Sequence, residues 1–171
     1  MKRIIDVNTG EVKVAGKNTL LRSVAIGSCI AVVAYDAGRK IGAMAHVMLP
    51  GRAPKKAEQK NKYAADAIEE MLSRMKRAGA DTDNIEVCLV GAGNVLGKKD
   101  DTICKQNIES TTGLLEREHI PVRGRVLGGT KRKGIFLDVE TGSVSYTEGD
   151  EKEKPLYEWT SGRNTDGVIP F

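Results

Sequence analysis

The sequence contains few aromatic residues, prolines, cysteines and histidines. Its 171 residues include 4% aromatics, five prolines, three cysteines and two histidines. No apolar run reaches the ~18 residues needed to span a bilayer, and the first residues lack the apolar segment of a secretory leader. Three cysteines without a close pair argue against a disulfide framework. We therefore expect a cytoplasmic protein without membrane insertion, in which thiols stay reduced.

Neither the basic residues nor the possible metal ligands form a cluster in the sequence. The formal net charge is +4, and no dense run of Lys and Arg with interleaved aromatics is present, so we predict no nucleic-acid surface. The cysteines and histidines lack the spacing of a zinc site. The glycines of residues 91–97 lack the G-x-G-x-x-G spacing of a dinucleotide loop. We expect neither a metal nor a nucleotide cofactor.

The apolar pattern predicts an α+β fold. The chain length suits a single core, and apolar residues at steps of three and four predict helices over 58–78 and 101–118. Strands precede, separate and follow these helices, without the regular β-α-β alternation of a doubly wound sheet. We expect one domain over 1–148 and a polar tail, ordered in part, over 149–171, with Trp159 as a candidate anchor. The predicted strands cover residues 2–7, 11–14, 20–26, 29–35, 40–49, 85–90, 122–127, 134–139 and 143–147.

Two of these strands carry the residues best suited to covalent chemistry. Cys29 follows Gly27 and Ser28 at the start of one strand, and His46 lies in the next. A two-residue turn at 37–38 would pair positions whose numbers add to 75, which places the thiol opposite the imidazole with Cβ atoms ~5 Å apart. A shift by one residue would put them on opposite faces. A thiol beside an imidazole base is the arrangement of a cysteine nucleophile.

A third residue, Ser23, is a candidate for orienting the imidazole. It precedes Cys29 by six residues, and an even spacing places both on one face if the chain is extended between them. Its hydroxyl would then accept a hydrogen bond from the ring of His46. Each residue also has an ordinary structural explanation, because a lone cysteine or histidine in an apolar strand is more often part of the core. Spacing alone leaves both interpretations open.

The two strands resemble the signature blocks of the CheD family. These blocks are GSCIAV at 27–32 and GAMAHVMLP at 42–50, at the family's spacing, and the likeness extends over residues 1–147. Further similar segments are Lys62-Tyr63-Ala64, Gly128-Gly129-Thr130 and Asp138-Val139-Glu140-Thr141-Gly142. The sequence departs from the family pattern at Ser23, where threonine is usual, and at Gly91-Ala92-Gly93, Cys104 and Arg132-Lys133.

The resemblance implies a protein-glutamine deamidase that converts glutamine side chains on the cytoplasmic helices of chemoreceptors to glutamate. Cys29 would be the nucleophile, His46 the base and Ser23 the orienting residue, with backbone N–H groups near Gly27 and Ser28 holding the oxyanion. No cofactor would be required. The resemblance also implies hydrolysis of methyl-glutamate esters and a CheC-type phosphatase as partner. It implies a layered fold like the catalytic domain of cytotoxic necrotizing factor, with two helices on one side.

Two other functions stay open on the sequence. The chain could be an adaptor that regulates a CheC-type phosphatase or a receptor without turnover, or a cysteine amidase that acts on another protein. The presence of both Cys29 and His46 favours an enzyme, because an adaptor needs neither.

Overall fold

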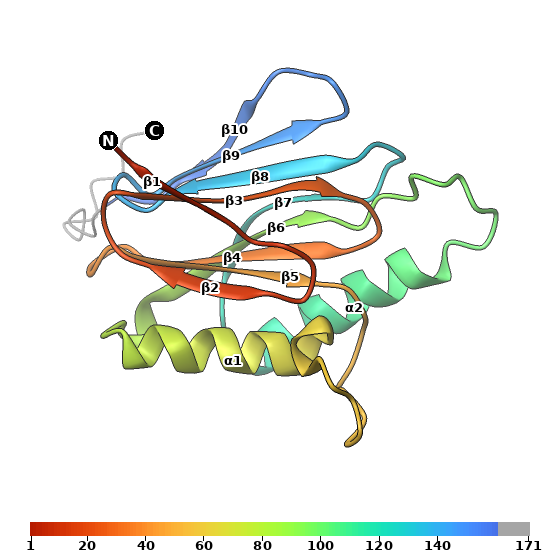
Figure 1. Ribbon diagram of the computed structural model, residues 1–171, viewed down its shortest axis with the longest axis horizontal. Coiled ribbons are helices and arrows are strands. Elements are labelled where there is room, and N and C mark those ends of the chain that lie inside the picture. Colours follow the sequence, from red (N-terminus) through yellow and green to blue (C-terminus); the bar gives the residue numbers. More distant parts are fainter. Residues whose placement is uncertain (161–171) are drawn as a thin grey trace.

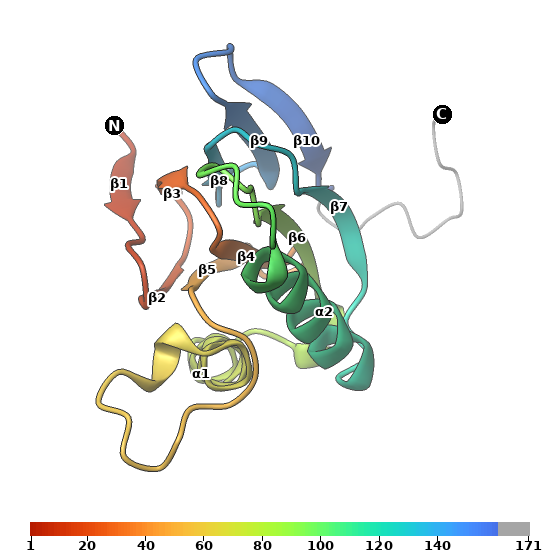
Figure 2. The same cartoon turned by 90° about the vertical axis from the view of Figure 1, so that its right-hand side faces the viewer.

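Two five-stranded β-sheets lie face to face, and two helices cover the outer face of one of them (Figure 1, Figure 2). The computed structural model describes residues 1–160. Sheet A has the strand order β1-β3-β8-β9-β10, and sheet B has the order β2-β5-β4-β6-β7. The strands are β1 (Arg3–Asp6), β2 (Val12–Ala15), β3 (Thr19–Ile26), β4 (Ile30–Asp36), β5 (Ile41–Val47), β6 (Ile85–Gly91), β7 (Val122–Leu127), β8 (Lys133–Asp138), β9 (Ser143–Glu148) and β10 (Lys154–Glu158), and the helices are α1 (Ala64–Arg77) and α2 (Thr102–Arg117). The predicted α+β fold, with layered sheets and both helices on one side, is confirmed.

Strand β4, at the centre of sheet B, is buried on both faces. Val32 and Ala34 pack in the core between sheet B and the helices. Ala31 and Val33 pack in the second core, between the two sheets. A strand covered on both faces is expected to be apolar throughout rather than alternating, which explains the unbroken run at this point of the sequence. Aliphatic side chains fill both cores, in keeping with the scarcity of aromatics.

The apolar pattern predicted a helix that starts near residue 58, but helix α1 begins at Ala64. The preceding segment is held in another conformation by the end of β5. The N–H groups of Met48 and Leu49 both donate to the carbonyl of Lys62, at 2.9 and 2.8 Å, and this pairing is incompatible with a helix that starts earlier. Neither helix within residues 1–160 combines the length and the apolar character that crossing a bilayer requires.

The β4–β5 hairpin has a longer turn than the sequence predicted. Asp36 pairs with Ile41 rather than with Arg39, so the loop contains four residues instead of two. The Asp36 carboxylate stabilises this loop by accepting hydrogen bonds from the N–H groups of Gly38 (3.0 Å) and Arg39 (3.2 Å). Lys40 completes the turn in the left-handed region, with φ of 51°. An aspartate that binds the backbone two and three residues ahead favours such a turn.

The longer turn corrects the predicted pairing of Cys29 with His46. The residue directly opposite His46 is Ala31. Because the register differs from the prediction by two positions, Cys29 remains on the same face as His46, but one diagonal step along the strand.

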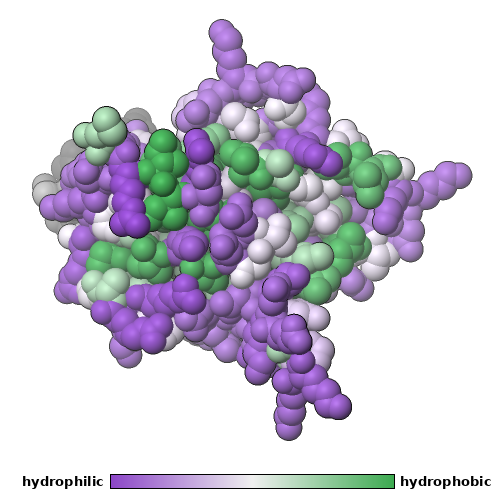
Figure 3. All heavy atoms as spheres, in the orientation of Figure 1, coloured by the Kyte–Doolittle hydropathy of each residue, from purple (hydrophilic) through white to green (hydrophobic). Residues whose placement is uncertain are grey.

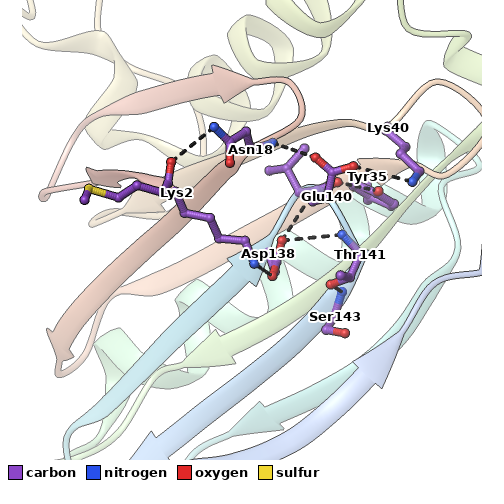
Figure 4. A network of polar contacts seen from close by, with 10 residues as sticks. Lys2, Asn18, Tyr35, Lys40, Asp138, Glu140, Thr141 and Ser143 are labelled. Atoms are coloured by element: carbon purple, nitrogen blue, oxygen red, sulfur yellow. Dashed lines mark hydrogen bonds and ion pairs between the residues drawn. The ribbon is translucent and has the colours of Figure 1, made fainter.

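A polar network closes the end of the sandwich that lies away from the start of β4 (Figure 4). Asp138 binds the Lys2 ammonium and accepts the N–H of Glu140 at 3.0 Å. The Glu140 carboxylate accepts the N–H of Asn18 at 3.0 Å, and the Tyr35 hydroxyl donates to a carbonyl of the β8–β9 turn at 2.7 Å. These contacts fasten the N-terminal strand, β3, β4 and the β8–β9 turn together. The sequence block at 138–142 therefore has a structural role far from the thiol.

Part of the predicted polar tail forms a strand that the sequence analysis did not predict. Strand β10 pairs with β9 at the edge of sheet A. Trp159 follows it and is 5% exposed, with its Nε1–H donating to the Glu86 carboxylate at 2.9 Å. Its ring lies 5.3 Å from that of Tyr35 and 5.2 Å from that of Tyr157, centroid to centroid. Trp159 thus anchors this segment to the domain, and residues 161–171 of the predicted tail lie outside the described residues.

Candidate active site

Ser23, His46 and Cys29 lie at one end of the space between the two sheets. Ser23 belongs to β3 in sheet A, His46 to β5 in sheet B, and Cys29 immediately precedes β4 in sheet B. Ser23 and His46 are 2% and 5% exposed, whereas Cys29 is half-buried. The thiol is therefore the member of the group most open to a substrate.

The hydrogen bonds of Ser23 determine which nitrogen of His46 carries its proton. The Ser23 hydroxyl lies 2.7 Å from the carbonyl oxygen of Val7 and 2.9 Å from Nδ1 of His46. A carbonyl oxygen only accepts, so the hydroxyl must donate to Val7. Its oxygen is then the acceptor for Nδ1–H, and Nε2 of a neutral imidazole is left without a proton. An unprotonated Nε2 is the form that a general base requires.

The contact between Ser23 and His46 arises by a different route from the one predicted. The chain is not extended from Ser23 to Cys29. Strand β3 has an irregularity between Ser23 and Ile26, with Ala25 at φ of 58°, and the chain then passes from sheet A to sheet B. The hydroxyl meets the imidazole because the two sheets face each other, not because the spacing of residues is even.

The turn that carries Cys29 is held by the end of β6. The N–H of Ala92 donates to the carbonyl of Cys29 at 2.7 Å, and the N–H of Gly93 donates to the carbonyl of Gly27 at 2.9 Å. Gly91 has a φ of 137°, and a Cβ on it would lie 2.3 Å from the Cys29 carbonyl oxygen. Only glycine allows this approach, so the Gly91-Ala92-Gly93 segment supports the thiol turn.

Three consecutive N–H groups of the same turn have no protein partner. In the described part of the chain, the N–H groups of Gly27, Ser28 and Cys29 donate to no protein acceptor. Free N–H groups next to a nucleophile are the usual donors to a tetrahedral oxyanion. The oxyanion role predicted for the turn at Gly27 and Ser28 stays a prediction, and the N–H groups without a protein acceptor are consistent with it.

Burial acts in opposite directions on the two reacting groups. It raises the pKa of the Cys29 thiol. It lowers the pKa of His46, against smaller opposing effects from the Val7 carbonyl and the Glu11 carboxylate. Both shifts favour the neutral form of the group concerned, the thiol for Cys29 and the uncharged imidazole for His46.

The other two cysteines are buried, in different parts of the core. Cys88 is fully buried in β6, and burial raises its pKa to about 12. Cys104 is 3% exposed in α2, and burial followed by a hydrogen bond with Asp101 raises its pKa to about 11. Within residues 1–160, no group of three or more His, Cys, Asp or Glu side chains is placed to hold a metal ion.

Apolar side chains lie exposed on segments adjoining the site. Val24 follows Ser23, Met48 follows β5, and Leu96 lies in the loop after β6; they are 56%, 38% and 77% exposed. On the face shown in Figure 3, apolar side chains form separate patches divided by polar ones. An open hollow of about 490 Å³ adjoins Val24, and its lining combines apolar residues with Lys131, Arg132 and Asp150.

Sequence reasoning missed Asn107, which connects the two strands that carry the thiol and the imidazole. This side chain is fully buried in α2, and its amide donates to the carbonyls of Ser28 (2.9 Å) and Met48 (3.1 Å). The available signal was a polar residue on the apolar face of the predicted helix, between Cys104 and Thr111.

Lys133 is a second residue that sequence reasoning did not assign to the site. It is 2% exposed, and its ammonium donates to the carbonyls of Gly128 and Lys131. It therefore fastens the loop between β7 and β8, which borders the segment after β6.

A half-buried thiol and an imidazole oriented by a hydroxyl, at the seam of a layered α+β fold, define a candidate cysteine–histidine site. Comparison with known proteins then identifies the family. The family model described as CheD chemotactic sensory transduction matches residues 48–148, and the chain belongs to the CheD family.

Several relatives carry names that state an activity. A "Probable chemoreceptor glutamine deamidase CheD" of Chlorobium luteolum is 42% identical over 152 residues, covering 88% of this chain and 76% of that protein. A protein of the same name from Methanococcus maripaludis is 33% identical, covering 86% of this chain and 97% of that protein. The "Chemoreceptor glutamine deamidase CheD" of Thermotoga maritima is 30% identical, covering 84% of this chain and 90% of that protein.

Among solved structures, the hypothetical protein YfiH of Bacillus licheniformis superposes with a TM-score of 0.45 at 15% identity, over 75% of this chain and 59% of that chain. The predicted likeness to cytotoxic necrotizing factor stays a prediction.

Proposed function

We propose that the protein is a glutamine deamidase that acts on chemoreceptors, with Cys29 as nucleophile, His46 as general base and Ser23 as the residue that orients His46. The names of the relatives support the substrate class. The observation that carries the mechanism is a pair of hydrogen bonds, in which Nδ1–H of His46 donates to the Ser23 hydroxyl and that hydroxyl donates to the Val7 carbonyl. This pair leaves Nε2 of His46 unprotonated on the face shared with Cys29.

The first half of the reaction forms a thioester and releases ammonia. Nε2 of His46 takes the proton of the Cys29 thiol as the sulphur bonds to the amide carbon of the glutamine side chain. The carbonyl oxygen becomes an oxyanion, which the free N–H groups of Ser28 and Cys29 bind. The imidazolium then gives its proton to the leaving nitrogen, the C–N bond breaks, and ammonia departs.

The second half uses water in place of the thiol. Nε2 of His46 takes a proton from the water as its oxygen attacks the thioester carbon. The C–S bond breaks, the sulphur recovers a proton from the imidazolium, and the side chain leaves as glutamate. A methyl ester of glutamate would pass through the same thioester with methanol as leaving group, which makes ester hydrolysis a second expected activity. Neither half requires a metal or an organic cofactor.

The substrate glutamines belong to the cytoplasmic helices of chemoreceptors, so the enzyme acts in the cytoplasm. The exposed apolar residues Val24, Met48 and Leu96 next to the site suit contact with the surface of a helix. A CheC-type phosphatase is the protein partner that we expect, and we expect no nucleic acid.

The test is turnover on receptor fragments. Purified protein is incubated with cytoplasmic fragments of receptors, and ammonia release and the gain of ~1 Da per converted glutamine are measured. We expect release by the wild type and by a Cys104→Ala control, which removes a buried thiol of α2, but not by Cys29→Ala. Binding of a CheC-type phosphatase without release from any receptor fragment would support the adaptor instead.

A further inference from the structure

The strand pairing that aligns β4 with β5 stops just short of Cys29. The last pair of the ladder is Ile30 with Val47, and the next position would place Cys29 opposite Met48. Beyond this point, no ladder hydrogen bond fixes the thiol turn relative to the strand of His46. Asn107 of α2 occupies this gap, with its amide nitrogen bonded to one carbonyl on each side, those of Ser28 and Met48.

The orientation of the Asn107 amide follows from its partners. Both partners are carbonyl oxygens, which only accept, so the NH₂ group faces them and Oδ1 turns away. Oδ1 is buried and has no hydrogen-bond partner among the described residues. A buried acceptor without a partner is unfavourable, so the two donated bonds are retained at a cost to stability.

The bond to Ser28 also controls the aim of an oxyanion donor. In a planar trans peptide the C=O and the following N–H point in opposite directions. Fixing the Ser28 carbonyl therefore fixes the direction of the N–H of Cys29, which donates to no acceptor within residues 1–160. Donation to the carbonyl also polarises the same peptide group and strengthens its N–H as a donor.

We propose that Asn107 is a positioning residue for the reaction: it clamps the Ser28–Cys29 peptide to the end of β5, and so sets both the aim of the Cys29 N–H and the approach of the thiol to His46. This inference rests on the proposed deamidase function. Asn107 itself is fully buried, and its hydrogen bonds reach the two carbonyls rather than the thiol or the imidazole.

The test compares Asn107→Ala with Thr111→Val. Thr111 is the matched control because it lies one helical turn further along α2, is fully buried, and has a hydroxyl without a partner among residues 1–160. Misplacing a reacting group by ~1 Å costs ~10²-fold in rate. We therefore expect Asn107→Ala to lower kcat on receptor glutamine by about 10- to 100-fold, with KM within about threefold of the wild type. Thr111→Val should retain kcat within about twofold.

A second readout needs no receptor. The rate of Cys29 alkylation by iodoacetamide is followed against pH, and in the wild type it should depend on deprotonation of His46. Asn107→Ala should lose this dependence, and Thr111→Val should keep it. Absence of ammonia release by the wild type would count against the deamidase function alone, whereas the alkylation profiles would still decide the role of Asn107.

Two results would overturn the proposal. One is wild-type kcat and a wild-type alkylation profile in Asn107→Ala. The other is an equal loss in Thr111→Val, which would attribute the effect to packing of α2. If Asn107→Ala does not fold, Asn107→Asp replaces it, because aspartate keeps the shape but offers both carbonyls an acceptor instead of a donor.

Discussion

Replacement of Ser23 by alanine tests the assignment of the His46 tautomer most directly. The change removes the oxygen that accepts Nδ1–H at 2.9 Å and the hydroxyl that donates to Val7 at 2.7 Å. It leaves a substitute partner, because the Val7 carbonyl already lies 3.5 Å from Nδ1. A small rotation of the ring would let Nδ1–H donate to that carbonyl directly.

The expected loss of activity is therefore modest. A hydrogen bond between neutral groups contributes ~0.5–1.5 kcal/mol, and each ~1.4 kcal/mol corresponds to a factor of ten in rate. Ser23→Ala should lower kcat by about 2- to 12-fold. The buried carboxylate of a serine protease triad is a different case, since its neutralisation costs ~10⁴-fold. Within residues 1–160 the polar groups beside Nδ1 are the Ser23 hydroxyl and the Val7 carbonyl, not a carboxylate.

The assay combines steady-state ammonia release with the ¹⁵N chemical shifts of the His46 ring. We expect the ring to be protonated on Nδ1 at neutral pH in the wild type, and also in the variant, where the Val7 carbonyl replaces the Ser23 hydroxyl as acceptor. Thr19→Val is the control, because it removes another hydroxyl from β3 at the opposite end of the strand. A wild-type ring that carries its proton on Nε2, or a loss above about 100-fold in Ser23→Ala, would refute the reasoning.

Other predictions concern reactivity, pH and stability. Cys29 should react with iodoacetamide faster than Cys88, because Cys88 is fully buried and burial raises its pKa to about 12; equal rates by peptide mass spectrometry would contradict this. Because burial lowers the pKa of His46, the acid limb of kcat/KM should fall below pH 6.5, and the contribution of this residue to stability, complete above pH 6.5, should decline as pH falls below that value. A limb above pH 6.5 would be inconsistent with a buried neutral base. Gly91→Ala should lower the free energy of unfolding by at least ~1–3 kcal/mol, since its Cβ meets the Cys29 carbonyl; an unchanged denaturant midpoint would argue against that close approach. Trp159→Ala should lower the free energy of unfolding by ~3–5 kcal/mol. A smaller loss, measured by thermal unfolding, would mean that β10 is not anchored through this side chain.

The sequence predicted the strand and helix pattern well because the apolar periodicity reflects burial. The apolar run at 29–35 predicted a strand, which the structure shows as β4 with both faces buried. The residues at steps of three and four on α1 face sheet B. The register of the β4–β5 hairpin was wrong by two positions, because the side chain of Asp36 stabilises a longer turn that residue counting cannot anticipate.

The candidate site was predictable only in part. Cys29 and His46 are rare residue types in adjoining strands, and their common face follows from parity, which an even shift of register preserves. The contact of Ser23 with His46 depends on two sheets packing face to face, and the bond from Asn107 to Ser28 joins segments 79 residues apart. Neither contact has a local signal in the sequence, since both arise from the tertiary arrangement.

The position of the site on the seam between the sheets has a mechanical consequence. The Ser23 hydroxyl belongs to sheet A, whereas the thiol and the imidazole belong to sheet B, and the core between the sheets packs the two halves against each other. Substitutions in that core that let one sheet slide over the other should reduce turnover before they reduce folding. For such substitutions, we expect the turnover rate to respond to a change in inter-sheet alignment before the melting temperature does.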